Sequence, residues 1–173
     1  MGELYLASFR ISGNTEKLKR AEEILEEAVK LSPTNQQGWW QLAEVQVSQG
    51  EIDKAISYLK KAVELEPRVG RSHWYLAMGY KIAGDYESAL KEVFEAEKTG
   101  ENRDQYNWRQ NESDVEKVID IYKGLGKTDE EIKEEFNKKD REMIELYQQL
   151  TELDPENAQR WASLAAAYAN LGL

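Results

Sequence analysis

The sequence predicts an all-α protein, a stack of about nine helices arranged as antiparallel pairs. The first observation is a 34-residue period that places alanine at two phases of successive units: Ala21, Ala55 and Ala89, then Ala28, Ala62 and Ala96. The second is a glycine at one phase, Gly50 and Gly84. The third is that each proline precedes a ring-bearing residue by six positions: Pro33 and Trp39, Pro67 and His73, Pro155 and Trp161. A period of this length is typical of helical hairpins that bury their apolar faces only by stacking, so function is expected on the shared surface.

The composition indicates a folded protein and excludes several classes of partner. Hydrophobic residues make up 40% of the 173 residues, charged residues 32% and aromatic residues 10%, which argues against disorder. The net charge is 23 − 33 = −10, and this sign repels phosphate backbones and anionic membrane surfaces. No apolar run reaches membrane-spanning length. We therefore expect no nucleic acid partner and no direct membrane insertion.

The first helix of each predicted pair shows apolar or small residues at spacings of three, four and seven. The third pair illustrates the pattern with His73, Leu76, Ala77 and Tyr80, followed by Gly84. The same spacing begins at Trp39, at Val115 and at Trp161. These spacings form one face of an α-helix. The glycine that follows can end the helix, because it adopts a left-handed conformation without a Cβ clash.

The second helix of each predicted pair carries the alanines. Two alanines on one stripe allow two helix backbones to approach closely, and the following proline prevents the helix from continuing. This pattern predicts two complete hairpin repeats, 35–69 and 70–100. Residues 1–34 show it only in part and are predicted to form a partial, atypical repeat.

The pattern changes after residue 100. Glu101 stands at the proline phase, and residues 101–111 are predicted to form an ordered connection, since Tyr106 and Trp108 would be costly to leave in water. Residues 112–157 are predicted to form an extended repeat with a long second helix from about 129 to 153. Residues 158–173 are predicted to form the terminal helix of a truncated repeat. We expect the whole chain, 1–173, to be a single domain.

The tetratricopeptide repeat is the family that these hairpins resemble. The resemblance rests on Trp39, Leu42, Ala43, Gly50, Ala55, Leu59, Ala62 and Pro67, and on their counterparts in the next unit. It covers residues 30–100 most fully, 112–173 with insertions and 1–29 in part. The resemblance implies a right-handed superhelical solenoid of helix pairs. It also implies that the first helices line a concave groove, which binds a peptide or helix of a partner protein.

Helix geometry predicts which side chains face that groove. If Trp39, Leu42 and Ala43 face the stack, the neighbouring side chains turn to the other side. The predicted groove residues are Gln37, Trp40, Gln41 and Glu44, and one period later Arg71, Trp74, Tyr75 and Met78. We expect Trp40 and Trp74 to contribute most to binding, because rigid aromatic side chains suit a peptide ligand. The alternative is that both tryptophans fill the angle between neighbouring helices and contact no ligand.

The same residues argue against one ligand class. Tetratricopeptide proteins that hold the acidic C-termini of chaperones place lysine, arginine and asparagine on this groove. In this chain only Arg71 is basic among the predicted groove residues. The clamp for a chaperone tail is therefore not expected.

The sequence predicts neither an enzyme nor a cofactor. Its single histidine, His73, lies at a phase where other units have tryptophan, which favours a packing role. Neighbouring acids such as Glu22 and Glu23 lie on predicted helix surfaces, without an apolar pocket to raise a pKa. There is no glycine-rich phosphate loop, no metal-ligand spacing of His and Cys, and no nucleophile elbow.

Three functions compete. The first is a protein-interaction scaffold that binds a partner in the groove. The second is the soluble tail of a larger membrane protein: the run 106–111, followed by Tyr147 and the segment 164–168, is similar to the repeat tails of bacterial membrane proteins with an O-antigen ligase or polymerase domain. The third is end-to-end self-association through the apolar face of the terminal helix. We expect a cytoplasmic protein, either free or tethered to a membrane through an upstream segment.

Overall fold

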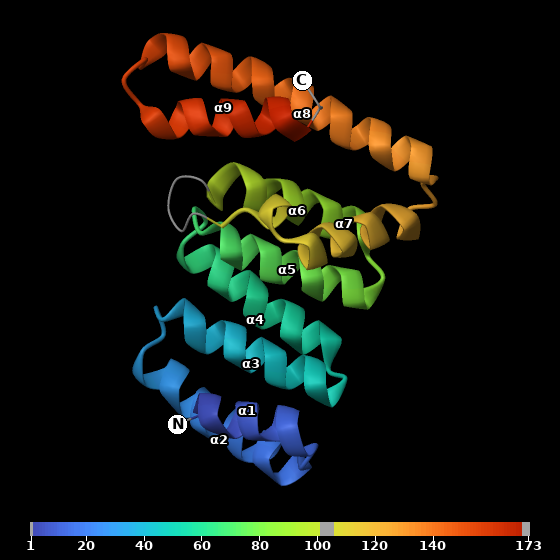
Figure 1. The fold of residues 1–173 in the computed structure, drawn as a ribbon. Coiled ribbons are helices and arrows are strands. Elements are labelled where there is room, and N and C mark those ends of the chain that lie inside the picture. The colour runs from blue at the N-terminus through green and yellow to red at the C-terminus, as the bar shows by residue number, and fades with distance from the viewer. Residues whose placement is uncertain (1, 101–105, 171–173) are drawn as a thin grey trace. The chain divides into compact units, whose positions relative to one another are not determined.

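A computed structural model describes residues 2–100 and 106–170. Within these residues all regular secondary structure is helical (Figure 1). The chain divides into two units, Met1–Leu125 and Gly126–Leu173, which are described separately. The first unit contains α1 (Gly2–Ser12), α2 (Thr15–Leu31), α3 (Gln36–Gln49), α4 (Ile52–Leu65), α5 (Gly70–Ala83), α6 (Tyr86–Gly100), a 3-10 helix (Trp108–Gln110) and α7 (Glu112–Gly124). The second contains α8 (Asp129–Leu153) and α9 (Ala158–Asn170). The expected all-α class with about nine helices is confirmed for the described residues.

The unit boundary lies inside the predicted extended repeat 112–157, between its two helices. In the first unit each helix packs against the next one in the chain, and α3 also packs against α5. Figure 1 shows the pair α1 and α2 at one end of this unit, followed by α3, α4 and α5, with α6 and α7 at the other end. The first helices α3 and α5 of successive pairs therefore lie side by side, as a stack of hairpins requires.

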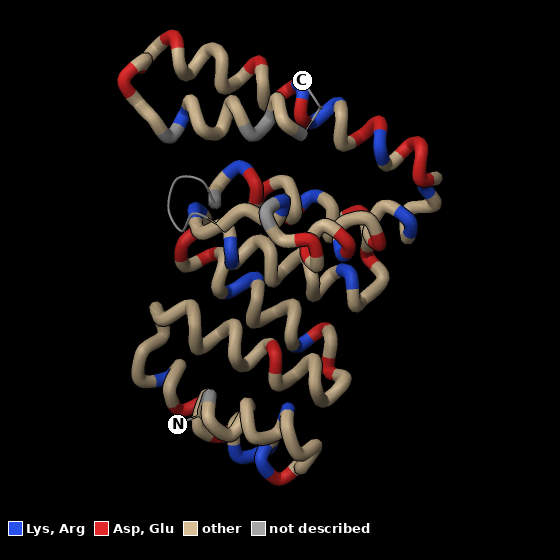
Figure 2. Tube along the Cα trace, in the orientation of Figure 1, with Lys and Arg blue, Asp and Glu red and all other residues tan. Residues whose placement is uncertain are grey.

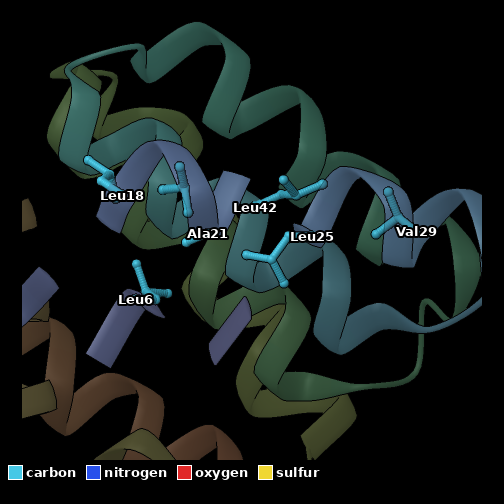
Figure 3. Close-up of a cluster of buried hydrophobic side chains, with 7 residues drawn as sticks. Leu6, Leu18, Ala21, Leu25, Val29 and Leu42 are labelled. Atoms are coloured by element: carbon cyan, nitrogen blue, oxygen red, sulfur yellow. The ribbon is translucent and has the colours of Figure 1, made fainter. Parts of the chain in front are cut away.

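Residues 2–31 form a helix pair, α1 and α2, although the sequence pattern there is only partial. Leu6 of α1 is 1% exposed and belongs to one buried cluster with side chains of α2 and α3. Figure 3 shows the cluster, with Leu6, Leu18, Ala21, Leu25, Val29 and Leu42 labelled. Apolar burial of this kind is the main stabilising contribution to such a core. α1 is thus an integral part of the stack.

The alanines of the second helices are buried between helices, as predicted, at most positions. Ala55, Ala62, Ala89 and Ala96 are completely buried between helices. Ala28 is the exception and is exposed.

Glycine ends the first helices as the sequence predicts. Gly50 and Gly84 follow α3 and α5 with φ of 81° and 78°. Their N–H groups donate hydrogen bonds to carbonyls of the last helical turn. A residue with a Cβ would adopt the same left-handed backbone conformation only with strain. Asn35 caps the other end of α3 by accepting a hydrogen bond from the Gln37 N–H at 3.1 Å.

The spacing of six residues between proline and ring has a structural cause. The Trp39 Nε1–H donates to the Pro33 carbonyl at 2.8 Å, and the Trp161 Nε1–H donates to the Pro155 carbonyl at 2.9 Å. His73 Nε2 lies 2.9 Å from the Pro67 carbonyl in the same arrangement. Each ring nitrogen thereby satisfies a carbonyl in the turn before its helix, a group that otherwise lacks a helical partner.

His73 is a buried packing residue, and its two nitrogens both face acceptors. Nδ1 lies 2.6 Å from Glu92 Oε2, while Nε2 faces the Pro67 carbonyl. Burial alone lowers the pKa of His73, but the bonds to Glu92 and Pro67, with the charges of Glu92 and Glu95, raise it above its ordinary value. This geometry favours the doubly protonated ring, because both nitrogens then donate.

Raising the pH is expected to destabilise the first unit through His73. Because its folded-state pKa is raised, its contribution to stability is complete below the unfolded-state pKa of about 6.5 and is lost as the pH rises through the folded-state pKa. Urea denaturation from pH 6 upward measures this loss. His73→Trp is the control, since tryptophan at this phase donates to the proline carbonyl without titrating; equal pH dependence of the two proteins would contradict the assignment.

The predicted connection after α6 is ordered where the structure describes it. Residues 101–105, including Glu101, lie outside the described residues. Trp108 is only 1% exposed, which makes it the largest fully buried side chain described. Arg109 Nε donates to Glu97 Oε1 on α6 with both side chains largely buried. The burial of Trp108 and this ion pair hold the connection against the helices. This agrees with the prediction that exposing its aromatic residues to water would be costly.

The second unit is a helix pair. α8 begins with a capping box at Thr128, whose Oγ1 accepts from the Glu131 N–H while the Glu131 carboxylate accepts from the Thr128 N–H. The predicted long helix from about 129 to 153 is confirmed. Ile144, Tyr147 and Leu164 form the buried core between α8 and α9.

Candidate binding groove

A cavity of about 490 Å³ opens on the first helices of the first unit. Its walls come from α1, α3 and α5, with Leu59 contributed by α4. This volume lies within the range of ligand pockets in proteins. The lining residues that sequence analysis predicted are Gln37, Trp40, Gln41, Glu44, Arg71, Tyr75 and Met78.

Trp74 is the predicted groove residue that does not line this cavity. It is 5% exposed, and its ring packs against Tyr106 from the connection. At this position the structure agrees with the alternative that the tryptophan fills a space between elements. Trp40, one period earlier, is half-buried and lines the cavity.

Trp40 is held in a fixed orientation by its neighbours on α5. Its Nε1–H donates to Ser72 Oγ at 3.2 Å, and its ring meets that of Tyr75 edge-on, with 5.3 Å between the centroids. The Gln36 amide also donates to Ser72 Oγ, at 3.2 Å, and to the Ala62 carbonyl, at 2.8 Å. Because the indole N–H already has a partner, Trp40 presents mainly apolar ring surface to the cavity.

Part of the cavity lining is apolar. The residues that form it are Leu6, Ala43, Val47, Leu59, Gly79 and Ile82. Gly79 stands where the neighbouring first helices have the fully buried Val45 and Ile121. A Cβ at Gly79 would lie 3.0 Å from Leu59 Cδ1, closer than side chains normally pack. Glycine therefore lets α5 approach α4 closely, which brings Leu59 to the cavity floor.

The charges of the groove differ from those that the sequence predicts. Arg10 Nε of α1 donates to Glu44 Oε1 on α3 at 2.6 Å, so the groove contains a second basic residue besides Arg71. Arg10 was not among the predicted groove residues, of which only Arg71 is basic. α3 itself carries a single charged residue, Glu44, and Figure 2 shows it as an almost uncharged helix.

Sequence analysis missed Leu6 and Arg10 because residues 1–34 match the repeat pattern only in part. The period itself contained the signal. Leu6 lies 34 positions before Trp40, and Arg10 lies 34 positions before Glu44. Continuing the groove phases upstream would have placed both side chains on the groove.

Next to this cavity, Tyr106 of the connection occupies the space beside Trp74 on α5. The Tyr106 ring lies 5.7 Å from the Trp74 ring, and its hydroxyl donates to Asp114 Oδ2 at 3.0 Å. Burial and the bond to Asp114 raise the pKa of Tyr106 far above its ordinary value. The neutral phenol is therefore a permanent part of this contact.

The residues that the structure describes contain neither a candidate metal site nor a candidate membrane-spanning helix. Within them, no group of three or more His, Asp or Glu side chains could hold a metal ion. In the same ranges, no helix combines the length and the apolar character that crossing a membrane requires.

Comparison with known proteins gives a family model and a set of solved structures. The model of the tetratricopeptide repeat matches residues 15–79. The crystal structure of MamA is similar over 96% of this chain and 84% of its own, with 19% identity and a TM-score of 0.56. No curated protein sequence matches the chain.

Two structures with bound partners are similar as well. The TPR2AB domain of yeast Sti1, in a complex with pHSP90, matches 73% of this chain and 46% of its own, with 18% identity and a TM-score of 0.54. The Yersinia enterocolitica type III secretion chaperone SycD, in complex with a peptide of the translocator YopD, matches 69% of this chain and 90% of its own, with 16% identity and a TM-score of 0.54. At these identities the likeness establishes the fold. The tetratricopeptide-repeat model thus covers residues 15–79, and the described chain has the fold of the tetratricopeptide-repeat proteins to which it is similar.

Proposed function

We propose that this protein is a non-enzymatic scaffold that binds a peptide or helix of a partner protein in the groove of α1, α3 and α5. The observation that carries the proposal is the cavity of about 490 Å³ beside Trp40. Its wall is a tryptophan fixed by Ser72 and Tyr75, and its floor is apolar. A rigid aromatic wall loses little conformational freedom on binding, which favours recognition of a peptide.

Similar proteins support the proposal. Sti1 and SycD share this fold, and their structures were solved with pHSP90 and with a peptide of YopD. In this chain the Arg10 guanidinium is bonded to Glu44, so the groove combines one ion pair with amides and apolar side chains. Such a lining suits an amphipathic segment better than a strongly acidic one.

Replacing Trp40 by alanine is expected to weaken peptide binding by about thirtyfold, the effect of losing a central aromatic contact worth about 2 kcal/mol. The measurement is selection of a phage-displayed 12-residue peptide library on the full chain, followed by calorimetric titration of the strongest synthetic peptide. Trp161→Ala is the matched control, because Trp161 lies in the second unit and does not line the cavity.

Trp40 also packs within the fold, so a milder variant accompanies it. Ile82→Ser changes an exposed cavity residue, and Ile11→Ser changes an exposed residue outside the cavity lining. We expect only the change at Ile82 to weaken binding. Peptides that bind all variants equally, or a library that yields no binder, would contradict the proposed function.

Self-association is a second candidate, and the second unit favours it. Trp161 of α9 is 50% exposed, and Leu153 at the end of α8 is also exposed. We propose that a second copy covers the Trp161 face. Light scattering is expected to show a dimer that Trp161→Gln dissociates; a monomer at millimolar concentration contradicts this candidate.

A further inference from the structure

Two successive sites on the first helices are built from residues at the same phases of the repeat. Trp40 and Trp74 are 34 positions apart. The pattern of α5 that begins at His73 returns in α7 at Val115, so Ser72 corresponds to Asp114 and Tyr75 corresponds to Lys117. Both sites therefore present a tryptophan on one helix and two residues of equivalent position on the next.

The second of these sites is occupied by a side chain of the protein itself. Tyr106 packs on Trp74 at 5.7 Å between ring centroids, at an interplanar angle of 42°. The Arg71 guanidinium lies 5.9 Å from the Tyr106 ring, and the Tyr106 hydroxyl donates to Asp114. An aromatic residue from a non-helical segment thus fills the space that this geometry creates next to a tryptophan.

The first site has the same tryptophan but keeps a cavity. The Trp40 ring lines a space of about 490 Å³, and Tyr75, 39% exposed, stands at its edge. Tyr75 stands at the position that Lys117 has in the second site. The Nζ of Lys117 lies 5.9 Å from the centroid of the Trp74 ring. The first site therefore offers two aromatic rings where the second offers one ring and a cation.

We infer that the groove accepts an aromatic side chain of the partner against Trp40 and Tyr75, as Trp74 accepts Tyr106. This inference rests on the proposed function and specifies the chemistry of the partner. The gain from aromatic packing exceeds that of equal apolar area, because edge and face contacts add to burial.

The equivalent positions also indicate which aromatic residue the site prefers. The hydroxyl of Tyr106 has an acceptor in the carboxylate of Asp114. Its counterpart, Ser72, is completely buried, and its oxygen already accepts from Trp40 and Gln36. A phenol oxygen placed there could accept from the Ser72 O–H, but the phenol's own O–H would have no acceptor in place of Asp114 and would lose its bond to water. The partner residue is therefore phenylalanine rather than tyrosine.

The composition of peptides selected on the full chain tests this inference. Phenylalanine is expected to be enriched over the input library, at one position of the aligned peptides. In the strongest synthetic peptide, replacing that phenylalanine by leucine is expected to weaken binding by about two- to tenfold, and replacing it by tyrosine by about tenfold. Trp40→Phe on the protein is expected to retain most of the affinity that Trp40→Ala loses, since it keeps an aromatic face.

The outcomes separate this inference from the proposed function. Peptides that need Trp40 or Ile82 but show no enrichment of aromatic residues overturn the inference and leave the proposed function standing. Equal affinity of the phenylalanine and leucine peptides would also overturn the inference and leave the proposed function standing. A library without groove-dependent binders overturns both. The Trp161→Ala and Ile11→Ser proteins are expected to select the same peptides as the original chain.

Discussion

Trp108→Ala is expected to lower the free energy of unfolding by about 3–5 kcal/mol, the range measured for removing a large buried aromatic side chain. Trp108 is 1% exposed, so alanine would leave a cavity as well as lose buried apolar area. The loss would also loosen the neighbouring Arg109, which is bonded to Glu97 on α6. Equilibrium denaturation in urea, followed by far-UV circular dichroism, measures the change.

Trp161→Ala is the matched control for this variant. Trp161 is 50% exposed, so its truncation removes less buried area and is expected to cost well under half as much. If the two variants were equally stable, the connection around Trp108 would not be packed as described. Tyr106 and Trp108 belong to the same short segment. In the Trp108→Ala protein, Tyr106 is therefore expected to lose its contact with Trp74.

Leu6→Ala is expected to lower the free energy of unfolding by about 2–5 kcal/mol, as for other buried leucines. Leu6 is 1% exposed and packs with Leu18, Leu25 and Leu42, which joins α1 to α2 and α3. It also lines the groove, so its truncation would widen the cavity beside Trp40. We therefore expect weaker peptide binding together with lower stability.

Leu4→Ala, on the same helix, is the control. Leu4 is 73% exposed, and its truncation is expected to change the free energy of unfolding by less than about 0.5 kcal/mol. The pair of variants has the same chemistry and nearly the same place in the chain. Equal stability of the two would mean that α1 is not part of the core, and the groove would then lose one wall.

Much of the groove could be predicted because a helix repeats its faces at a fixed spacing. Once Trp39, Leu42 and Ala43 are assigned to the packed face, the other face of α3 follows, and Trp40 and Glu44 do line the cavity. Arg10 could have been found by the same argument, one period upstream. It was missed because the flanking residues of α1 depart from the pattern.

The sequence by itself determined the helical hairpins, the capping glycines Gly50 and Gly84 and the side of α3 that lines the groove, since all of these depend on residues a few positions apart. It could not separate Trp40 from Trp74, which occupy one phase of the repeat. Only the tertiary structure decided that Tyr106 covers Trp74 and that Trp40 keeps a cavity. The physical reason is that a side chain's accessibility depends on segments distant in the chain, and periodicity along one helix does not report them.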